Sequence, residues 1–403
     1  MPVQNASKII VAAKAQTGLG TAASGAGAFG LEVTPSQGTA MQVAAIESQL
    51  IQRSRMRKKP RHGSRSVSGS YETELMVGSL HDVQEAVMGG TWAAAQTLDH
   101  TTLTSATISD SGATITFAGG NLLTSGVRVG MMARFADMSV TENNNVWFPI
   151  LAISGAEGRV WTTDATLLAD NTADTAFSVT IARSLATTAA GYVDRYFTVE
   201  EWGLDVEEGK LITDARWNQL SVSVAPDGPA RVSLGLGARN MAPQATSPNF
   251  TSPVFTEGDP LILRDGGVYV NGVKKVNLTG ITAGLAAPVS HVPVIGATLS
   301  PDVFLGQFAF TGEFTGVVQD YTDFTTFTNE DQISVLLHFA ERDGSPADFE
   351  SVYFGNLSFG GYSSPAGGEG ALIQTIPLWG GSDERGTQYA ATTALWSTSH
   401  TPA

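Results

Sequence analysis

Gly63-Ser-Arg-Ser-Val-Ser-Gly69-Ser-Tyr71, near the start of the chain, has a counterpart far downstream, Gly306-Gln-Phe-Ala-Phe-Thr-Gly312-Glu-Phe314. Both stretches place two glycines six positions apart, a hydroxyl residue before the second glycine, and an aromatic residue two positions after it. In both, a predicted strand is followed by a segment with helical potential, at 79–88 and 329–339. A repeat of this kind indicates a duplicated structural unit, so the sequence predicts two homologous cores.

The composition favours strands and tight turns. The 403 residues include 44 glycines and no cysteine, and 15% of them are charged. Glycine, serine and threonine are frequent in turns and strands, and a chain without cysteine has neither disulfides nor thiolate metal sites. No stretch resembles a secretory signal or reaches the ~20 apolar residues of a membrane-spanning helix, so we expect a soluble protein that stays in the cytoplasm where it is made.

The net charge of −15 is unevenly distributed along the chain. Seven of the 23 basic residues lie between positions 53 and 65, which leaves 16 basic residues against 38 acidic ones elsewhere. So acidic a chain binds nucleic acid poorly, because attraction to phosphates dominates sequence-independent affinity. The basic stretch is a nucleic-acid patch, a solvated loop, or, as we favour, a loop that contacts acidic surface on another copy of the chain. Its basic residues are Arg53, Arg55, Arg57, Lys58, Lys59, Arg61 and Arg65.

The first predicted core is discontinuous in the sequence. It comprises residues 31–96 and 191–240, and its helix carries Leu80, Val83, Val87 and Met88 on one face, with Ser79 as N-cap and Gly89 as stop. Between the two parts, residues 97–190 read as short strands separated by Gly, Asn and Asp turns, which predicts an inserted small β-domain on the outside.

The remaining segments are predicted from composition and position. Residues 1–30 are rich in small residues and are either a disordered terminus or an arm that orders against a neighbouring subunit. Residues 241–260 contain a Pro- and Ser-rich linker, residues 261–381 form the second core, and residues 382–403 are a loosely tethered tail.

Neither a catalytic nor a metal-binding motif stands out. The six histidines are scattered and form no pair with helical or alternating spacing. The stretch from Gly203 to Lys210 resembles a phosphate loop, but it has one residue too many between its glycines, and Leu211 replaces the required hydroxyl residue. The sequence therefore predicts no cofactor and no enzyme activity.

The order of these elements resembles the major tail tube proteins of long, non-contractile-tailed bacteriophages. The resemblance rests on the Gly-x-Val-Ser-Gly-x-Tyr strand after a basic loop, the acidic strand Phe197-Thr-Val-Glu-Glu-Trp202, and the hairpin turn at 223–228. In the second half it rests on 265–273, 299–306 and 310–314. The likeness covers most of residues 31–381, and its motifs are patterns of strands and turns.

The resemblance implies two tandem β-sandwich cores, each with a flanking helix, whose long strands pair with those of neighbours in an intersubunit β-barrel. Single-core relatives form six-fold rings, so two cores per chain imply a homotrimeric, pseudo-hexameric ring. Stacked rings would form the tail tube that conducts DNA to the host. The implied partners are the tape measure protein and the tail terminator and baseplate proteins. The implied location is the virion tail, after assembly in the host cytoplasm.

Within this family the charged residues acquire expected roles. DNA must pass through the lumen without specific binding, and an acidic wall repels phosphate. The expected lumen-facing residues are Glu72, Glu74 and Glu313, with Asp205, Glu207 and Glu208 as further candidates. The basic loop is expected between rings, and the repeated core positions are Gly69, Tyr71, Gly312 and Phe314. The alternatives are another β-rich virion component (a capsid-decoration or baseplate protein), a β-rich hydrolase, and a nucleic-acid binder acting through residues 53–65.

Overall fold

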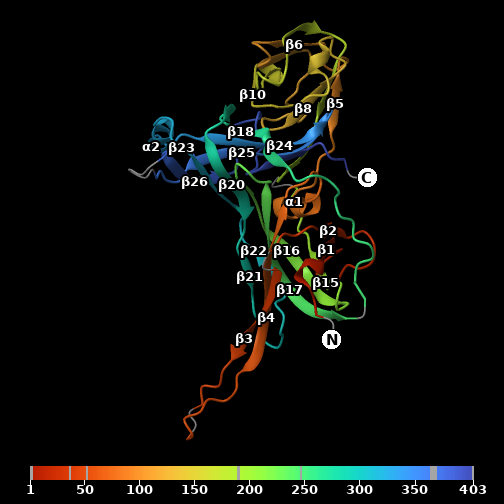
Figure 1. Ribbon diagram of the computed structural model, residues 1–403, viewed down its shortest axis with the longest axis vertical. Helices are drawn as coiled ribbons and strands as arrows, with labels where there is room; N and C mark the ends of the chain where they lie inside the picture. Colours follow the sequence, from red (N-terminus) through yellow and green to blue (C-terminus); the bar gives the residue numbers. More distant parts are fainter. Residues whose placement is uncertain are drawn as a thin grey trace.

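The computed structural model describes residues 3–35, 38–50, 53–187, 191–245, 247–363 and 370–401. The molecule is elongated: a small β-domain lies at one end of the long axis, and the hairpin of β3 (Gly38–Ile46) and β4 (Arg61–Glu74) projects at the other (Figure 1). Two β-rich cores lie between these ends, and a single 16-stranded sheet runs through both. The fold is mainly β, as the sequence predicts.

The first core combines antiparallel strands with one short helix. Its strands pair in the order β2-β1-β15-β16-β17-β4-β3. Alternation along β4 explains how the core forms: Val67, Tyr71 and Thr73 are buried on one face, which Gly69 shares, and residues 68, 70, 72 and 74 face the other side. The other elements are β1 (Ile9–Ala15), β2 (Phe29–Leu31), α1 (His81–Met88), β15 (Phe197–Gly203), β16 (Glu208–Val224) and β17 (Arg231–Ala245).

The second core repeats this topology. Its strands pair in the order β19-β18-β24-β25-β26-β23-β20, again antiparallel throughout, and each occupies the place of the corresponding strand of the first core in chain order. The elements are β18 (Ile262–Val270), β19 (Val273–Lys275), β20 (Leu278–Ala286), β23 (Ala309–Val317), α2 (Thr322–Thr328), β24 (Ile333–Gly344), β25 (Ala347–Phe359) and β26 (Ile373–Gly381).

A shared irregularity strengthens the equivalence of the two cores. The register of β15 on β16 shifts between Phe197 and Val199, and the register of β24 on β25 shifts between Ile333 and Val335. These are the same positions once the strands are matched pair by pair. A bulge is a specific local feature of a strand pair, so its recurrence supports the duplication that the repeated glycine motif predicts.

The two helices agree with the sequence prediction only in part. Helix α1 ends at Gly89 in the left-handed conformation (φ 62°), as expected. It begins two residues after Ser79, which does not cap it; the Ser79 hydroxyl donates to the carbonyl of Met76. The helix predicted at 329–339 was wrong. Most of that segment is β24, which is paired on both sides, and the helix is α2, whose Thr- and Phe-rich sequence gives weak helical propensity.

The inserted domain is a pair of small sheets with an aromatic interior. One sheet has the order β10-β11-β7-β6-β12 and the other β5-β13-β8-β9. Phe117, Phe135 and Trp161 pack at its centre. Its strands are β5 (Gln96–Asp99), β6 (Ser105–Ser109), β7 (Thr114–Ala118), β8 (Met132–Ala136), β9 (Trp147–Pro149), β10 (Ala152–Ser154), β11 (Val160–Thr162), β12 (Asn171–Asp174) and β13 (Ser178–Ile181).

Although it interrupts the first core in sequence, the inserted domain packs against the second core. Its apolar cluster continues into Tyr269, Leu336 and Tyr353. The Tyr269 hydroxyl donates to a carboxylate oxygen of Asp164 at 2.9 Å. Burial and this contact raise the pKa of Tyr269 above its ordinary value. The insertion therefore ties the two cores together.

Both ends of the chain differ from their predictions. Strand β1, within the predicted arm, pairs with β15 and β2 of its own chain, and its Ala13 is fully buried. In the predicted loose tail, β27 (Leu395–Thr398) lies between β25 and β14 (Arg183–Ala186). Residues 1–2 and 402–403 lie outside the described ranges.

The predicted linker is not a simple spacer. Strand β17 continues through its first residues to Ala245, and Phe250 and Val254 form parallel bridges to the β1–β2 region. Phe250 is buried, and its N–H donates to Glu200. Residue 246 lies outside the described ranges. Two short strands, β21 (Val289–His291) and β22 (Val303–Leu305), form a separate ribbon after β20.

Candidate assembly surface

The two cores are joined edge to edge by backbone pairing. The second half of β16 pairs antiparallel with β20, from Gln219 opposite Ala286 to Val224 opposite Ile281. In the pairing orders of the two cores, β16 corresponds to β25 and β20 corresponds to β3. The junction within the chain is thus a contact between the end of β16 in the first core and β20 of the second core, and the counterpart of β20 in the first core is β3.

The face of this joined sheet that points away from the core is polar and carries three of the predicted acidic residues. On β4, Glu72 is exposed and Glu74 half-buried, on the face opposite Tyr71; on β23, Glu313 is exposed next to the buried Phe314. A cross-strand row connects two of them across the junction. It runs from Glu74 through Arg231, Ser223 and Thr282 to Glu313.

The other three acidic candidates lie elsewhere. Asp205 and Glu207 lie in the turn between β15 and β16, and Glu208 begins β16. Asp205 accepts from Lys8 at 2.8 Å and from the backbone N–H of Asn5 at 3.0 Å. These bonds to Lys8 and Asn5 lower the pKa of Asp205. The turn belongs to the β15–β16 hairpin and does not share the exposed face of β4 and β23.

The repeated glycines have the same local environment in both cores. A Cβ at Gly69 would lie 2.8 Å from the carbonyl oxygen of Gly38, and one at Gly312 would lie 2.6 Å from that of Thr282. Both contacts are with the neighbouring strand, β3 or β20, at matching positions. The aromatic residues two positions later, Tyr71 and Phe314, are buried. The motif therefore lets a neighbouring strand approach closely while its aromatic ring fills the core.

The basic stretch forms the exposed end of the β3–β4 hairpin (Figure 1). Arg61 and Arg65 belong to β4, and the other basic residues lie in the loop before it. Within the described residues the stretch makes one ion pair, Arg57 with Glu47 at 3.4 Å. Both side chains are largely exposed, so this pair contributes little stability. The hairpin thus presents positive charge that its own chain does not neutralise.

Four polar side chains of the first core meet beside the start of β3. Glu201 on β15 accepts hydrogen bonds from the Tyr71 hydroxyl at 2.9 Å, from the Thr39 hydroxyl, and from the Thr39 backbone N–H at 3.1 Å. Lys210 on β16 donates to Glu201 at 2.8 Å and to the Thr39 carbonyl at 3.5 Å. Burial alone would raise the pKa of Glu201, but the bonds from Lys210 and Thr39 outweigh it and lower the pKa.

This polar cluster was not predicted from the sequence. One feature of the sequence could have indicated it: Glu200 and Glu201 lie between the apolar residues Val199 and Trp202, in a strand whose residues are all buried. A buried carboxylate requires partners. The partners come from β3, β4 and β16, and only the fold brings them to Glu201.

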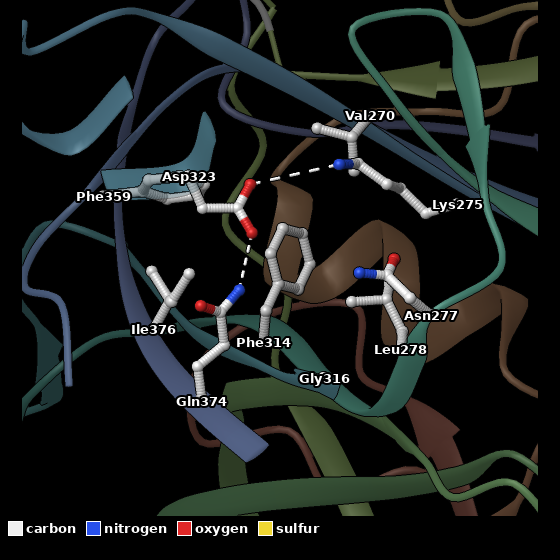
Figure 2. A pocket seen from close by; sticks show the side chains of 10 residues that line it. All are labelled: Val270, Lys275, Asn277, Leu278, Phe314, Gly316, Asp323, Phe359, Gln374 and Ile376. Atoms are coloured by element: carbon white, nitrogen blue, oxygen red, sulfur yellow. Dashed lines mark hydrogen bonds and ion pairs between the residues drawn. The ribbon is translucent and has the colours of Figure 1, made fainter. Parts of the chain in front are cut away.

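A small cavity lies inside the second core (Figure 2). Asp323 of α2 lies at one side, 2.6 Å from the Gln374 amide and 3.9 Å from Lys275, and Phe314 forms part of the apolar lining. The volume of about 20 Å³ has room for about one water molecule. Within the described ranges no group of His, Asp and Glu is arranged to hold a metal ion, and no helix is long and apolar enough to cross a bilayer.

A duplicated antiparallel core, an edge-to-edge joint and a polar sheet face define a structural β-protein built for edge pairing. In a comparison with family models, the model described as phage tail tube protein matches residues 6–378. The chain belongs to the phage tail tube protein family, and it is a structural component of the phage tail. This family is a structural one and not a family of enzymes. A search of curated proteins found no match.

Proposed function

We propose that three copies of this chain close a ring of six cores around a bore, and that stacked rings form the tube through which phage DNA passes. The carrying observation is the β16–β20 pairing inside the chain. This pairing between the two cores of one chain supports the same kind of contact between cores of neighbouring chains. By the equivalence of the cores, we propose that the edge of β3 pairs with the segment that follows Phe359 of β25 in the next copy.

These two edges are complementary, and the contact between copies is head-to-tail. Within the described residues, β3 pairs with β4 and with no other strand, and residues 40–42 on it are exposed. A head-to-tail contact yields a closed ring when its rotation divides a full turn, and a helix otherwise. If the junction between copies repeats the rotation of the junction within the chain, all six cores are quasi-equivalent, and ring closure removes every open edge.

The bore in this proposal is lined by the polar face of the joined sheet. Glu72, Glu74 and Glu313 would point into it, alongside serine and threonine side chains and one cation, Arg231. Carboxylates repel DNA phosphates, and small hydroxyl residues offer few contacts to bases. Asp205, Glu207 and Glu208 lie in the β15–β16 hairpin, and we assign them no place in the bore.

The basic hairpin is proposed to contact the next ring. An acidic groove of the second core offers complementary charge, although it also contains Arg264 and Arg342. Burial and the charges of Asp348 and Asp259 raise the pKa of Glu341 in this groove, so an approaching cation would relieve repulsion there. Complementary charge of this kind favours correct register more than raw affinity. The acidic residues are Glu257, Asp259, Asp265, Glu341, Asp343 and Asp348.

The tape measure, terminator and baseplate proteins expected from the resemblance remain proposed partners at the bore and the tube ends. We also propose that the tail is of the non-contractile type and that the tube is assembled in the host cytoplasm.

Electron cryomicroscopy of tubes assembled from the purified chain tests the ring. We expect three chains per ring, near-sixfold symmetry of the cores, β3 paired with the strand end after β25 of the next copy, and Glu72, Glu74 and Glu313 on the bore wall. A ring closed by a different number of chains, or one without this strand pairing, would overturn the proposal. So would a protein that stays monomeric under every assembly condition tried.

Reversing the hairpin charge with Arg57→Glu, Lys58→Glu and Lys59→Glu should leave rings intact and shorten the tubes. Loss of charge complementarity weakens stacking, while the β3 edge is unchanged. Tube length in negative-stain images is the readout. The charge-preserving variant Arg57→Lys, Lys58→Arg and Lys59→Arg should give tubes of normal length. Full-length tubes from the reversed variant would show that this hairpin does not mediate stacking.

A further inference from the structure

The polar cluster around Glu201 has an apolar counterpart in the second core. Matching the strands through their registers aligns Thr39 with Ala283, Tyr71 with Phe314, Glu201 with Leu337 and Lys210 with Val352. All four residues in the second core are buried and apolar. One core is therefore stable with a packed apolar set at the positions where the other carries an ion pair, a hydroxyl and a phenol.

The two sets differ in what lies beside them. In the second core, Ala283 on β20 lies opposite Val222 of β16, so the first core covers that edge. In the first core, the equivalent residue Thr39 has no strand on its outer side within the described ranges. The N–H and C=O of one strand residue point to the same side. Glu201 binds the Thr39 N–H and Lys210 the Thr39 C=O, so the two side chains occupy the position of a missing strand.

We propose that the Glu201–Lys210 ion pair is a removable guard on the β3 edge, which another copy of this chain must displace when it adds its strand. The inference rests on the proposed ring function. The occupant is a second copy, because the equivalent edge of β20 is already paired with β16 of this same sequence. An open edge is a template for uncontrolled pairing, and charged side chains are a common protection.

The energetics favour a guard over a purely structural ion pair. Burying the Glu201 carboxylate carries a desolvation cost that a packed apolar set avoids, and the second core shows that such a set fits this fold. The Lys210 side chain is 46% exposed, so it can swing into solvent. When Lys210 leaves, the Thr39 C=O becomes available to an incoming strand. The Thr39 N–H becomes available when Glu201 gives up that one bond, and Glu201 then keeps the hydrogen bonds from the Tyr71 and Thr39 hydroxyls.

The test transplants the apolar set into the first core with Thr39→Ala, Tyr71→Phe, Glu201→Leu and Lys210→Val. Assembly from purified monomer is followed by light scattering and electron microscopy. We expect nucleation about tenfold faster than wild type, a factor that corresponds to about 1.4 kcal/mol. Tyr71→Phe alone is the matched control, since it leaves both contacts to the Thr39 backbone in place; it should assemble at close to the wild-type rate.

A folded fourfold variant that assembles at the wild-type rate, or more slowly, overturns the guard and leaves the ring proposal standing. Failure of the wild-type chain to form rings overturns the ring itself. Lys210→Met provides a second test if the fourfold variant does not fold, because it removes the ammonium group while Glu201 keeps its three hydrogen bonds from Tyr71 and Thr39. It should also accelerate nucleation, and an unchanged rate would contradict the guard.

Discussion

Met41→Pro should abolish ring assembly while the monomer remains folded. Met41 lies on β3 two residues beyond Thr39, so its N–H points to the same outer side. Its counterpart in the second core, Leu285, lies opposite Leu220 in the junction between the cores. Proline has no N–H, and its ring obstructs an incoming strand. Because this N–H does not face β4, the edge tolerates proline within the monomer.

The expected loss is large because every junction between copies carries the substitution. A proline at a ladder position removes a hydrogen bond and leaves its acceptor unpaired, at a cost of about 1–3 kcal/mol, which corresponds to a factor of about 5 to 150 in association at each junction. Met41→Ala keeps the N–H and serves as control. The critical concentration for assembly is the measurement, with circular dichroism to verify the fold. Tubes of the proline variant at the wild-type concentration would show that β3 is not the assembly edge.

Trp396→Ala should be the most destabilising of the single substitutions considered for the monomer. Trp396 on β27 is 2% exposed and belongs to the main apolar cluster of both cores. Its strand pairs with β25 on one side and with β14 on the other. Removing so large a buried side chain costs about 3–5 kcal/mol. Loss of β27 packing also loosens the inserted domain from the second core.

Trp379→Ala is the matched control, because Trp379 is 67% exposed on β26. Urea unfolding of monomers kept below the assembly concentration gives the free energy of unfolding for each variant. We expect a change within about 0.5 kcal/mol for Trp379→Ala, as for most surface sites. A loosely tethered tail would predict equally small effects for both tryptophans, so equal effects would contradict the role assigned to β27.

The duplication of the core could be predicted from the sequence because it depends on local steric requirements that recur in both copies. Glycine is needed at positions 69 and 312 because the neighbouring strand passes within 3 Å of the place where a Cβ would lie. The aromatic rings of Tyr71 and Phe314, two positions later, fill the interior of each core. These demands act on residues close together in the chain, so they leave a readable pattern. The stop of α1 at Gly89 was predicted for the same reason.

Other features were decided by pairing between distant segments. The run from Ile333 to Phe339 is apolar enough for either a helix or a strand, and β18 and β25 on its two sides select the strand. Residues 1–30 were predicted to be a disordered terminus or an arm that orders against a neighbouring subunit, yet β1 pairs with β15 of its own chain. Residues 382–403 were predicted to be a loosely tethered tail, but β27 within them pairs with β25 on one side and with β14 on the other.

By itself, the sequence of this tail tube protein determined its class, its duplicated core motif, and the separation of a basic loop from an acidic body. Only the tertiary structure decided which edges are covered, that the insertion bridges to the second core, and that Glu201 and Lys210 cap Thr39. The physical reason is range. Backbone conformation and side-chain size are set by neighbours in sequence, whereas edge pairing and charge burial depend on residues that lie far apart in the sequence, such as Thr39 and Glu201, which are 162 positions apart.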